Sequence, residues 1–322
     1  AVNAQTGHES EAPITMVEQA RHVLIVGGGP AGMEAARMAA LRGHRVTLVE
    51  RSDRLGGTLF FAGLAYAENG RLLDYLVRQM KHPRIEVRLG TTVDGALLAQ
   101  LKPDEILVAT GARRAAPAIE GAEQNHVWSG DELRRLMTGD RADEVARAKL
   151  SLTERALFKA GGMLGVTDSA AALQNLSKLW MPLGKKVVII GGGLVGLELA
   201  EFLLARGRQV TVLEPGTHPG TELPIVRRWR VVEAVQAHGK LHLQAQVQRI
   251  ERKQVLWLDK KGQEQRTDAD SVVLALGAEP DASAAEQLQA LTSVPVRRLG
   301  DSAALGYIEG AMHSGHHAGR TV

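Results

Sequence analysis

The sequence has 322 residues and a formal net charge of +3, with 39 lysines and arginines against 36 aspartates and glutamates. This length favours two domains, and charges of mixed sign without a basic block argue against a nucleic-acid partner. No cysteine is present, which excludes disulfides, thiolate metal ligands, iron–sulfur ligation and a C-x-x-C redox pair.

The given sequence predicts neither a membrane span nor a signal peptide. No apolar run approaches the length of a membrane span, and the N-terminus lacks the apolar core of a signal peptide. We therefore expect a cytoplasmic protein with no membrane partner. The chain begins with Ala1 and not with Met, so we also expect it to be part of a longer protein.

Residues 1–20 show no periodicity and predict an extended arm, after which a dinucleotide-binding pattern runs from Val23 to Glu50. It consists of an apolar strand, a G-x-G-x-x-G turn (Gly27–Gly32, the first fingerprint), a helix, and a strand that ends in an acidic residue. The first glycine allows the tight turn, the second lets backbone amides approach a pyrophosphate, and the third lets the helix pack on the strand. The helix N-terminus attracts the anion, and the acidic residue binds a ribose hydroxyl pair.

The same pattern occurs again from Val187 to Glu214, with its positions shifted by 164 (191 − 27). Residues Gly191–Gly196 form the second fingerprint. Two fingerprints in the same context predict two dinucleotide sites. The alternative is a duplicated doubly wound domain in which one site is inactive.

The segments that follow the first copy also indicate ligand binding. The paired glycines Gly56 and Gly57 permit close approach of the backbone to a ligand, although an ordinary surface turn would also explain them. We expect a helix from about Gly70, a strand over 84–89, and a buried strand over 105–111 that ends on small residues. Ligands of open parallel sheets bind at that carboxyl edge.

Residues 131–182 interrupt the repeat and predict a helical insertion outside both parallel sheets. A short helix is expected at 133–137, a capping box at 151–154 and a helix at 169–180. Three roles stay open for this segment: covering a cofactor, docking a partner, or none.

The second copy then repeats the layout of the first. The expected elements are a helix at 225–238, a strand at 241–247, a hairpin of 248–258 and 264–273, a strand at 272–276, a strand at 296–299 and a helix start at 307–312. Ala275-Leu276-Gly277 is the counterpart of Ala109-Thr110-Gly111, so small residues that end a strand at the carboxyl edge of a sheet are expected in both copies.

Residues outside the fingerprints give weaker signals. Histidines near the C-terminus lie on an expected frayed tail without nearby carboxylates, so no metal site is predicted; they are His313, His316 and His317. The tryptophans are expected to pack in cores; they are Trp128, Trp180, Trp229 and Trp257. An arginine cluster predicts a solvated helix face, with contact to a nucleotide 2′-phosphate as the alternative; it comprises Arg227, Arg228 and Arg230.

Together these motifs resemble the flavoprotein superfamily with two dinucleotide-binding domains. The closest resemblance is to the C-terminal portion of the NADH:flavin oxidoreductase family, which includes 2,4-dienoyl-CoA reductases and trimethylamine dehydrogenases. The segments that carry it are Val2-Asn3, Gly27–Ala36, Glu50–Gly57, Ala109–Gly111, Gly191–Glu198 and Gly300-Asp301. It covers essentially the whole chain except residues 131–182.

The resemblance implies an α/β fold of two Rossmann-like domains, with an NAD(P)-binding domain inserted into a discontinuous FAD-binding domain. The FAD domain would comprise residues 1–130 and 277–322, and the NAD(P) domain residues 131–276. Full-length members also have an N-terminal flavin barrel and a four-cysteine cluster. Neither is present here, so this chain would be the reductase portion of a longer protein.

The resemblance also assigns the cofactor-binding residues. Those expected at FAD are Gly27, Gly29, Pro30, Ala31, Gly32, Glu50, Arg51, Gly57, Thr58, Val93, Ala109, Thr110, Gly111 and Asp301. Those expected at NAD(P)H are Gly191, Gly193, Leu194, Val195, Gly196, Glu198, Glu214 and Gly277. Asp301 would contact the flavin side chain, with a helix cap as the alternative, and Glu198 would lie near the nicotinamide.

The implied function is an FAD-dependent NAD(P)H oxidoreductase module that passes hydride from NADH to FAD. Electrons would continue to an iron–sulfur or FMN partner domain or subunit, for reduction of an unsaturated acyl-CoA or similar enoyl substrate. No catalytic side chain is predicted, because the cofactors carry the chemistry. The alternative is a redox-silent domain that holds ADP and supports assembly of a larger flavoprotein. A homo-oligomer stays open.

NADH is expected in preference to NADPH. Glu214 ends the strand where a carboxylate accepts both ribose hydroxyls, and a 2′-phosphate there would meet a like charge. Residues 215–218 supply no arginine to compensate. The reach of Arg206 and Arg208 from the preceding helix stays open.

Overall fold

The computed structural model describes residues 2–10, 13–114, 118–138, 142–150, 155, 181 and 183–322. The chain divides into two compact units: unit 1 combines Ala1–Arg113 with Ala278–Val322, and unit 2 is Arg114–Gly277. The predicted capping box at 151–154 and the predicted helix at 169–180 lie outside the described residues.

The first boundary between the units differs from the one predicted at residue 130. Strand β6 (Val127–Ser129) pairs in parallel with β13 (Ser271–Leu274) and therefore belongs to the sheet of unit 2. Its pairing partner is remote in the sequence, so no local pattern could assign this short strand. The two connections between the units contain β5 (Ala112–Arg114) and β14 (Ala278–Pro280), which pair with each other.

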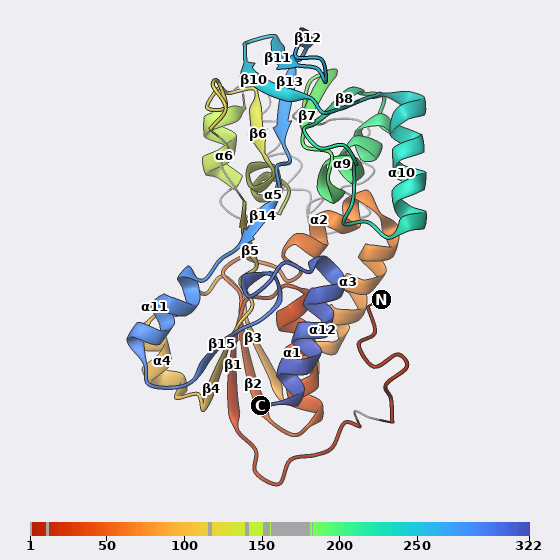
Figure 1. Cartoon of the computed structure of the whole chain (residues 1–322). Helices are drawn as coiled ribbons and strands as arrows, with labels where there is room; N and C mark the ends of the chain where they lie inside the picture. Colours follow the sequence, from red (N-terminus) through yellow and green to blue (C-terminus); the bar gives the residue numbers. More distant parts are fainter. Residues whose placement is uncertain are drawn as a thin grey trace. The chain divides into compact units, whose positions relative to one another are not determined.

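Unit 1 is built on a sheet whose described strands are all parallel, in the order β15-β4-β1-β2-β3 (Figure 1). These strands are β1 (His22–Val26), β2 (Arg45–Val49), β3 (Ile85–Arg88), β4 (Glu105–Val108) and β15 (Val296–Arg298). The central strands are runs of Val, Leu and Ile that are almost fully buried. This pattern is typical of parallel strands covered by helices on both faces.

Helices cover both faces of this sheet. On one side lie α1 (Pro30–Leu41), α2 (Thr58–Ala65), α3 (Ala67–Gln79) and α12 (Tyr307–Arg320), the last preceded by the 3₁₀ turn η2 (Gly300–Ser302). On the other lie α4 (Gly95–Leu101) and α11 (Ser283–Leu291), whose leucines pack with Leu24 and Ile106 of the sheet.

Helices α1 and α12 pack closely at glycines. A Cβ added to Gly315 would lie 2.3 Å from the carbonyl oxygen of Ala31. On the same helix His316 is buried, and its Nδ1 lies 3.2 Å from Glu34 Oε1, while Arg37 donates two hydrogen bonds to the same carboxylate. Burial raises the pKa of Glu34, but the hydrogen bonds from Arg37 and His316 outweigh it and lower the pKa overall.

The C-terminal histidines therefore do not lie on a frayed tail, and that prediction is wrong. His313, His316 and His317 belong to α12, which continues to Arg320 because its apolar face packs on α1. Among the described residues there is no group of three or more His, Asp or Glu side chains that could hold a metal ion.

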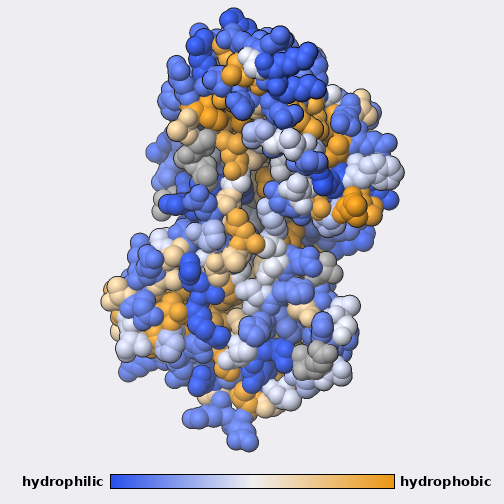
Figure 2. All heavy atoms as spheres, in the orientation of Figure 1, coloured by the Kyte–Doolittle hydropathy of each residue, from blue (hydrophilic) through white to orange (hydrophobic). Residues whose placement is uncertain are grey.

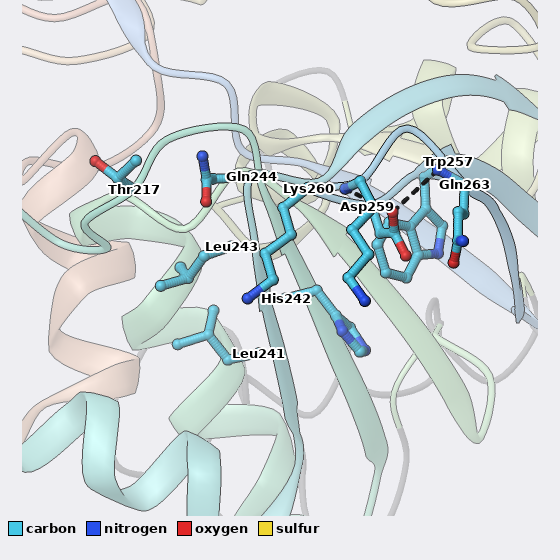
Figure 3. Close-up of a pocket in the computed structure, with 10 residues that line it drawn as sticks. Thr217, Leu241, His242, Leu243, Gln244, Trp257, Asp259, Lys260 and Gln263 are labelled. Atoms are coloured by element: carbon cyan, nitrogen blue, oxygen red, sulfur yellow. Dashed lines mark hydrogen bonds between the residues drawn. The ribbon is translucent and has the colours of Figure 1, made fainter.

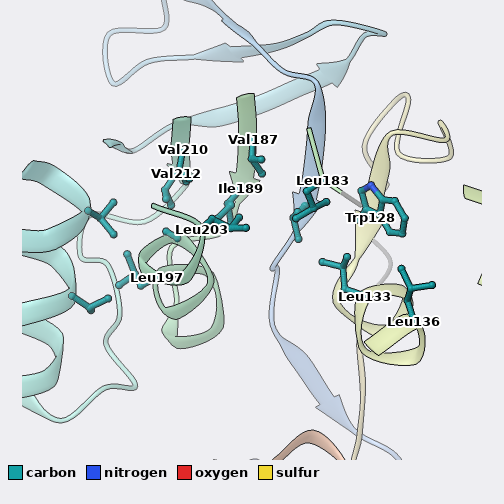
Figure 4. Packing of buried hydrophobic residues seen from close by; sticks show 14 of the residues in the cluster. Trp128, Leu133, Leu136, Leu183, Val187, Ile189, Leu197, Leu203, Val210 and Val212 are labelled. Atoms are coloured by element: carbon teal, nitrogen blue, oxygen red, sulfur yellow. The ribbon is translucent and has the colours of Figure 1, made fainter. Parts of the chain in front are cut away.

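Unit 2 contains a second parallel sheet, with the described strand order β6-β13-β7-β8-β9. Its further strands are β7 (Lys186–Ile190), β8 (Gln209–Glu214) and β9 (Lys240–Leu243), and its described helices are α5 (Gly130–Thr138), α6 (Ala142–Lys149), α9 (Leu194–Leu204) and α10 (Ile225–His238). An antiparallel sheet of β10 (Gln246–Ile250), β11 (Gln254–Leu258) and β12 (Glu264–Asp268) adjoins it. Figure 4 shows how strand residues such as Ile189 and Val212 pack against Leu197 and Leu203 of α9.

Two predicted strands are each split in the structure. The strand expected at 241–247 becomes β9 and β10, because Gln244 has a φ of 54° and turns the chain into the antiparallel sheet. The arm expected at 264–273 becomes β12 and β13, which belong to different sheets. Apolar residues alternate without interruption from 241 to 247, so periodicity alone could not separate β9 from β10.

The prediction that the tryptophans pack in cores is wrong for Trp229, which is exposed. Trp128 and Trp257 are buried, but Trp229 on α10 is 67% exposed, and Ile225 beside it is 82% exposed. Figure 2 shows a mostly hydrophilic face with apolar residues over one end of α10. Trp180 lies outside the described residues. Within the described part of the chain, no helix combines the length and apolar character needed to cross a membrane.

Candidate dinucleotide sites

The first fingerprint is a tight turn from β1 into α1 that only glycine can form. Gly27 has a φ of 112°, its N–H donates to the Val49 carbonyl at 2.8 Å, and an added Cβ would lie 2.5 Å from the Ala109 carbonyl oxygen. This contact places the turn against the end of β4, where Ala109 and Thr110 were predicted to lie at the ligand-binding edge of the sheet. The backbone at the carboxyl end of β4 therefore contacts the first fingerprint directly.

Glu50 is buried at the end of β2, and its carboxylate points back at the turn. Its Oε2 accepts the Gly28 N–H at 2.7 Å, and its Oε1 accepts the N–H and the hydroxyl of Ser52 at 2.9 and 2.5 Å. These bonds fix the carboxylate beside the fingerprint, the position from which an acidic side chain reaches an adenosine ribose.

Open space lies at the N-terminus of α1. A Cβ added to Gly29, which caps this helix, would have no atom within 4 Å. The first turn of α1 carries no acidic residue, so no carboxylate of that turn pairs with its N–H groups. A pyrophosphate fits these features, because it needs both room and unpaired donors.

Further predicted residues surround this opening. A Cβ on Gly57 would lie 3.4 Å from the Cα of Gly29, and Thr58 begins α2 directly afterwards. Arg51 follows Glu50 and is exposed, whereas Val93 packs on the core. Residues Pro30, Ala31 and Gly32 form the first turn of α1, and Thr110-Gly111 follow β4.

Asp301 caps a helix in the structure. Its Oδ1 accepts the N–H of Gly306, which precedes α12, at 2.9 Å and the N–H of Tyr307, the first residue of α12, at 3.1 Å. The preceding Gly300 packs on α1, since an added Cβ would lie 2.8 Å from the Cβ of Ala31. Asp301 therefore lies on the turn beside the first fingerprint, and its contact with a flavin stays a prediction.

The second fingerprint repeats this geometry in unit 2. Gly191 has a φ of 108°, its N–H donates to the Leu213 carbonyl at 2.8 Å, and an added Cβ would lie 2.3 Å from the Ala275 carbonyl oxygen. The carboxylate of Glu214 accepts the Gly192 N–H at 2.5 Å and the Gly216 N–H at 2.6 Å. Leu194, Val195 and Gly196 form the first turn of α9, and Gly277 follows β13.

Glu198 on α9 pairs with Arg227, which was expected on a solvated helix face. Arg227 of α10 lies 3.6 Å from Glu198 and also donates to Glu201, and its side chain is only 21% exposed. The predicted solvated face is therefore wrong for Arg227, which joins α9 to α10. Burial raises the pKa of Glu198 against the opposing charge of Arg227.

One residue at the second fingerprint was missed by the sequence analysis. The Glu222 carboxylate accepts the Leu194 N–H at 3.3 Å, and an added Cβ on Gly193 would lie 3.1 Å from its Oε1. Gly29, the counterpart of Gly193, has no such neighbour. The shift of 164 that relates the two copies also relates Thr58 to Glu222.

A separate cavity of about 420 Å³ lies beside the edge strand β9 (Figure 3). The rings of His242 and Trp257 are 4.7 Å apart on its wall, and Lys260 extends from the turn between β11 and β12 toward β9. Burial lowers the pKa of His242. The cavity touches Thr217, but it includes no residue of the second fingerprint.

Comparison with known proteins covers most of the chain. The family model described as pyridine nucleotide-disulphide oxidoreductase matches residues 21–294. An NADH oxidase of Thermoanaerobacter brockii is 30% identical over 321 residues, which cover 98% of this chain and 43% of that protein. A bilirubin reductase of Mediterraneibacter gnavus is 35% identical over 215 residues, 66% of this chain and 27% of that protein.

Solved structures give the same fold. A 2-naphthoyl-CoA reductase complex matches with a TM-score of 0.79 and 25% identity, over 99% of this chain and 43% of that one. A histamine dehydrogenase from Rhizobium matches with a TM-score of 0.72 at 19% identity, which shows the fold alone. The chain thus spans less than half the length of these proteins.

These matches confirm the predicted family resemblance, the α/β Rossmann-like fold class and the FAD and NAD(H) cofactors. The chain itself contains no cysteine, so it cannot supply the disulphide in the family description. On the match over residues 21–294, the chain belongs to the pyridine nucleotide-disulphide oxidoreductase family, whose enzymes depend on FAD and NAD(H).

Proposed function

We propose that the chain is an oxidoreductase module in which unit 1 holds FAD and unit 2 holds NADH. The observation that carries this proposal is the shared geometry of two complete fingerprints. In each, a glycine turn is pressed against the carboxyl end of a neighbouring strand, and an acidic residue bonds the amide of the turn's second residue. Two such turns in one chain favour two dinucleotides over one.

Unit 1 suits FAD because its fingerprint leaves the α1 N-terminus open. Gly29 provides room, the N–H groups of the first turn of α1 would bind the pyrophosphate, and Glu50 would hold the adenosine ribose. The N-terminus of α12 follows Asp301, and a helix N-terminus stabilises negative charge on a reduced flavin ring.

Unit 2 would bind NADH through the second fingerprint and Glu214. The pair of cofactors, when bound, supplies hydride transfer from reduced nicotinamide to flavin. Residues of this chain would bind and orient them, and no side-chain acid or base is required. The Glu198–Arg227 pair would fix the nicotinamide end of α9.

Three observations favour NADH over NADPH. Glu214 presents a carboxylate where the ribose hydroxyls would lie, and residues 215–218 contain no arginine. The guanidinium of Arg206 lies 3.4 Å from the centre of the Phe202 ring and donates to the Phe202 carbonyl, so it is engaged within its own helix segment. A 2′-phosphate would therefore meet a like charge, and neither residues 215–218 nor Arg206 would compensate it.

Electrons would leave the module for an iron–sulfur or FMN partner domain or subunit. This proposal is supported by the lengths of the related NADH oxidase and 2-naphthoyl-CoA reductase chains, since the matched region is 43% of each. An unsaturated acyl-CoA or similar enoyl compound is the proposed final substrate. The names of the 2-naphthoyl-CoA reductase and of a 34% identical cinnamate reductase of Clostridium sporogenes favour this class.

Cofactor content of the purified chain tests the proposal. We expect one FAD per chain, visible as flavin absorbance and recovered by chromatography after denaturation. Recovery of ADP without flavin would contradict the proposal and favour the redox-silent alternative. Substituting Gly29→Glu then tests whether the flavin occupies the first fingerprint.

A further inference from the structure

The N-terminus of α9 already holds a negative charge from the chain itself. Glu222 lies on the loop before α10, and its Oε2 accepts the Leu194 N–H at 3.3 Å. Its Oε1 lies where a Cβ of Gly193 would come within 3.1 Å. The first turn of α9 has no acidic residue of its own. The carboxylate therefore occupies the place at which the second fingerprint would receive a phosphate.

The loop that carries Glu222 is built like the corresponding loop of unit 1. Gly220 donates its N–H to the Gly192 carbonyl at 2.8 Å, and Gly56 donates to the Gly28 carbonyl at the same distance. These glycines are related by the same shift of 164 as the fingerprints. The two glycines therefore bring their loops to the fingerprints in the same way.

At the matched position the residue type differs, and so does the local structure, because Thr58 begins α2 whereas Glu222 lies on the loop before α10. Unit 1 has Thr58, a neutral side chain, and the space at Gly29 is open. Unit 2 has Glu222, which closes that space at Gly193. A threonine hydroxyl can donate a hydrogen bond to a phosphate, whereas a carboxylate repels it.

We propose that Glu222 competes with the pyrophosphate of the bound dinucleotide for the N-terminus of α9 and so weakens binding of NADH to unit 2. This inference rests on the proposed function of that unit. The carboxylate must leave the Leu194 N–H before a phosphate can take its place. Glu222 is exposed, so it can turn into water without unfolding its loop, which keeps the penalty small. Weaker binding favours rapid release of the oxidised nucleotide.

The expected size of the effect follows from the geometry. The bond of 3.3 Å is long and solvent-exposed, and a charge at a helix N-terminus is a modest interaction in such a place. Repulsion between Glu222 and the pyrophosphate adds to it at short range. Together they predict a loss of roughly three- to tenfold in NADH affinity relative to a neutral residue.

The test compares Glu222→Gln and Glu222→Thr with the wild-type chain, by isothermal titration with NADH and with adenosine. The threonine variant restores the residue type of unit 1. Glu233→Gln is the matched control, because it removes the same charge from an exposed position on α10. Thermal unfolding checks that each variant is folded.

We expect both Glu222 variants to bind NADH three- to tenfold more tightly, with adenosine binding and the control unchanged. If wild type binds NADH and neither variant binds it more tightly, Glu222 only caps α9 and the inference is overturned while the proposed function stands. If wild type and variants all fail to bind NADH, the proposed function of unit 2 fails together with the inference.

Discussion

Replacing Glu214 with alanine is expected to change the nucleotide preference of unit 2. The carboxylate is half-buried and bonds the amides of Gly192 and Gly216, which aims it at the ribose position. Hydrogen bonds to a charged group contribute about 1.5–3 kcal/mol, and partial exposure favours the lower figure. Loss of the ribose contact should therefore weaken NADH binding about tenfold.

NADPH should respond in the opposite direction. Its 2′-phosphate would lie close to the Glu214 carboxylate, and a repulsion of about 1 kcal/mol at 4 Å in water disappears in the variant. That change improves NADPH affinity about fivefold, so the ratio of the two affinities should move by about fiftyfold. Any loosening of the turn at Gly192 affects both nucleotides equally and cancels in the ratio.

Dissociation constants for both nucleotides, measured by titration on the same preparations, provide the test. Glu50→Ala is the control, because it removes the matched carboxylate of the first fingerprint and should leave the ratio unchanged. An unchanged ratio in Glu214→Ala, or wild type that binds NADPH as tightly as NADH, would refute the role given to Glu214.

Three further predictions concern unit 1. Gly29→Glu should abolish bound FAD by placing a charge against the pyrophosphate, whereas Gly70→Glu on α3, which also has open space, should retain it; equal flavin content in the two would contradict the assignment. Because the pKa of Glu34 is lowered, its stabilising contribution is complete above about pH 4.3 and is lost as pH falls through the folded-state pKa. The free energies of unfolding in urea at pH 7 and pH 3 should therefore differ less in Glu34→Gln than in wild type. Burial lowers the pKa of His22, so its contribution is present above about pH 6.5 and is lost below it; unfolding free energies at pH 7.5 and pH 5.5 should differ less in His22→Gln, and an equal difference would argue against this residue.

The local parts of both sites could be predicted from sequence because single residue types determine them. Gly27 and Gly191 need a positive φ and close backbone contact, which other residues do not tolerate, so the spacing of glycines predicts the turn. Helix α10 was predicted with the bounds it has in the structure, Ile225–His238.

Contacts between remote segments could not be predicted in this way. The partner of β6 in the sheet is β13, and the partners of Arg227 are Glu198 and Glu201 on another helix. Neither pairing leaves a periodic trace in the sequence. Glu222 was missed for a different reason: it matches Thr58 only by the shift of 164, and the two residue types share no pattern that marks a site.

The proposal that this chain passes electrons from NADH to FAD is tested most directly by anaerobic stopped-flow spectroscopy. The purified chain, with its bound FAD, is mixed with NADH while flavin absorbance is followed. We predict complete bleaching in a single turnover, and no bleaching in a chain whose second fingerprint carries Gly193→Glu. A chain that holds stoichiometric FAD and is not reduced by NADH would contradict the proposal.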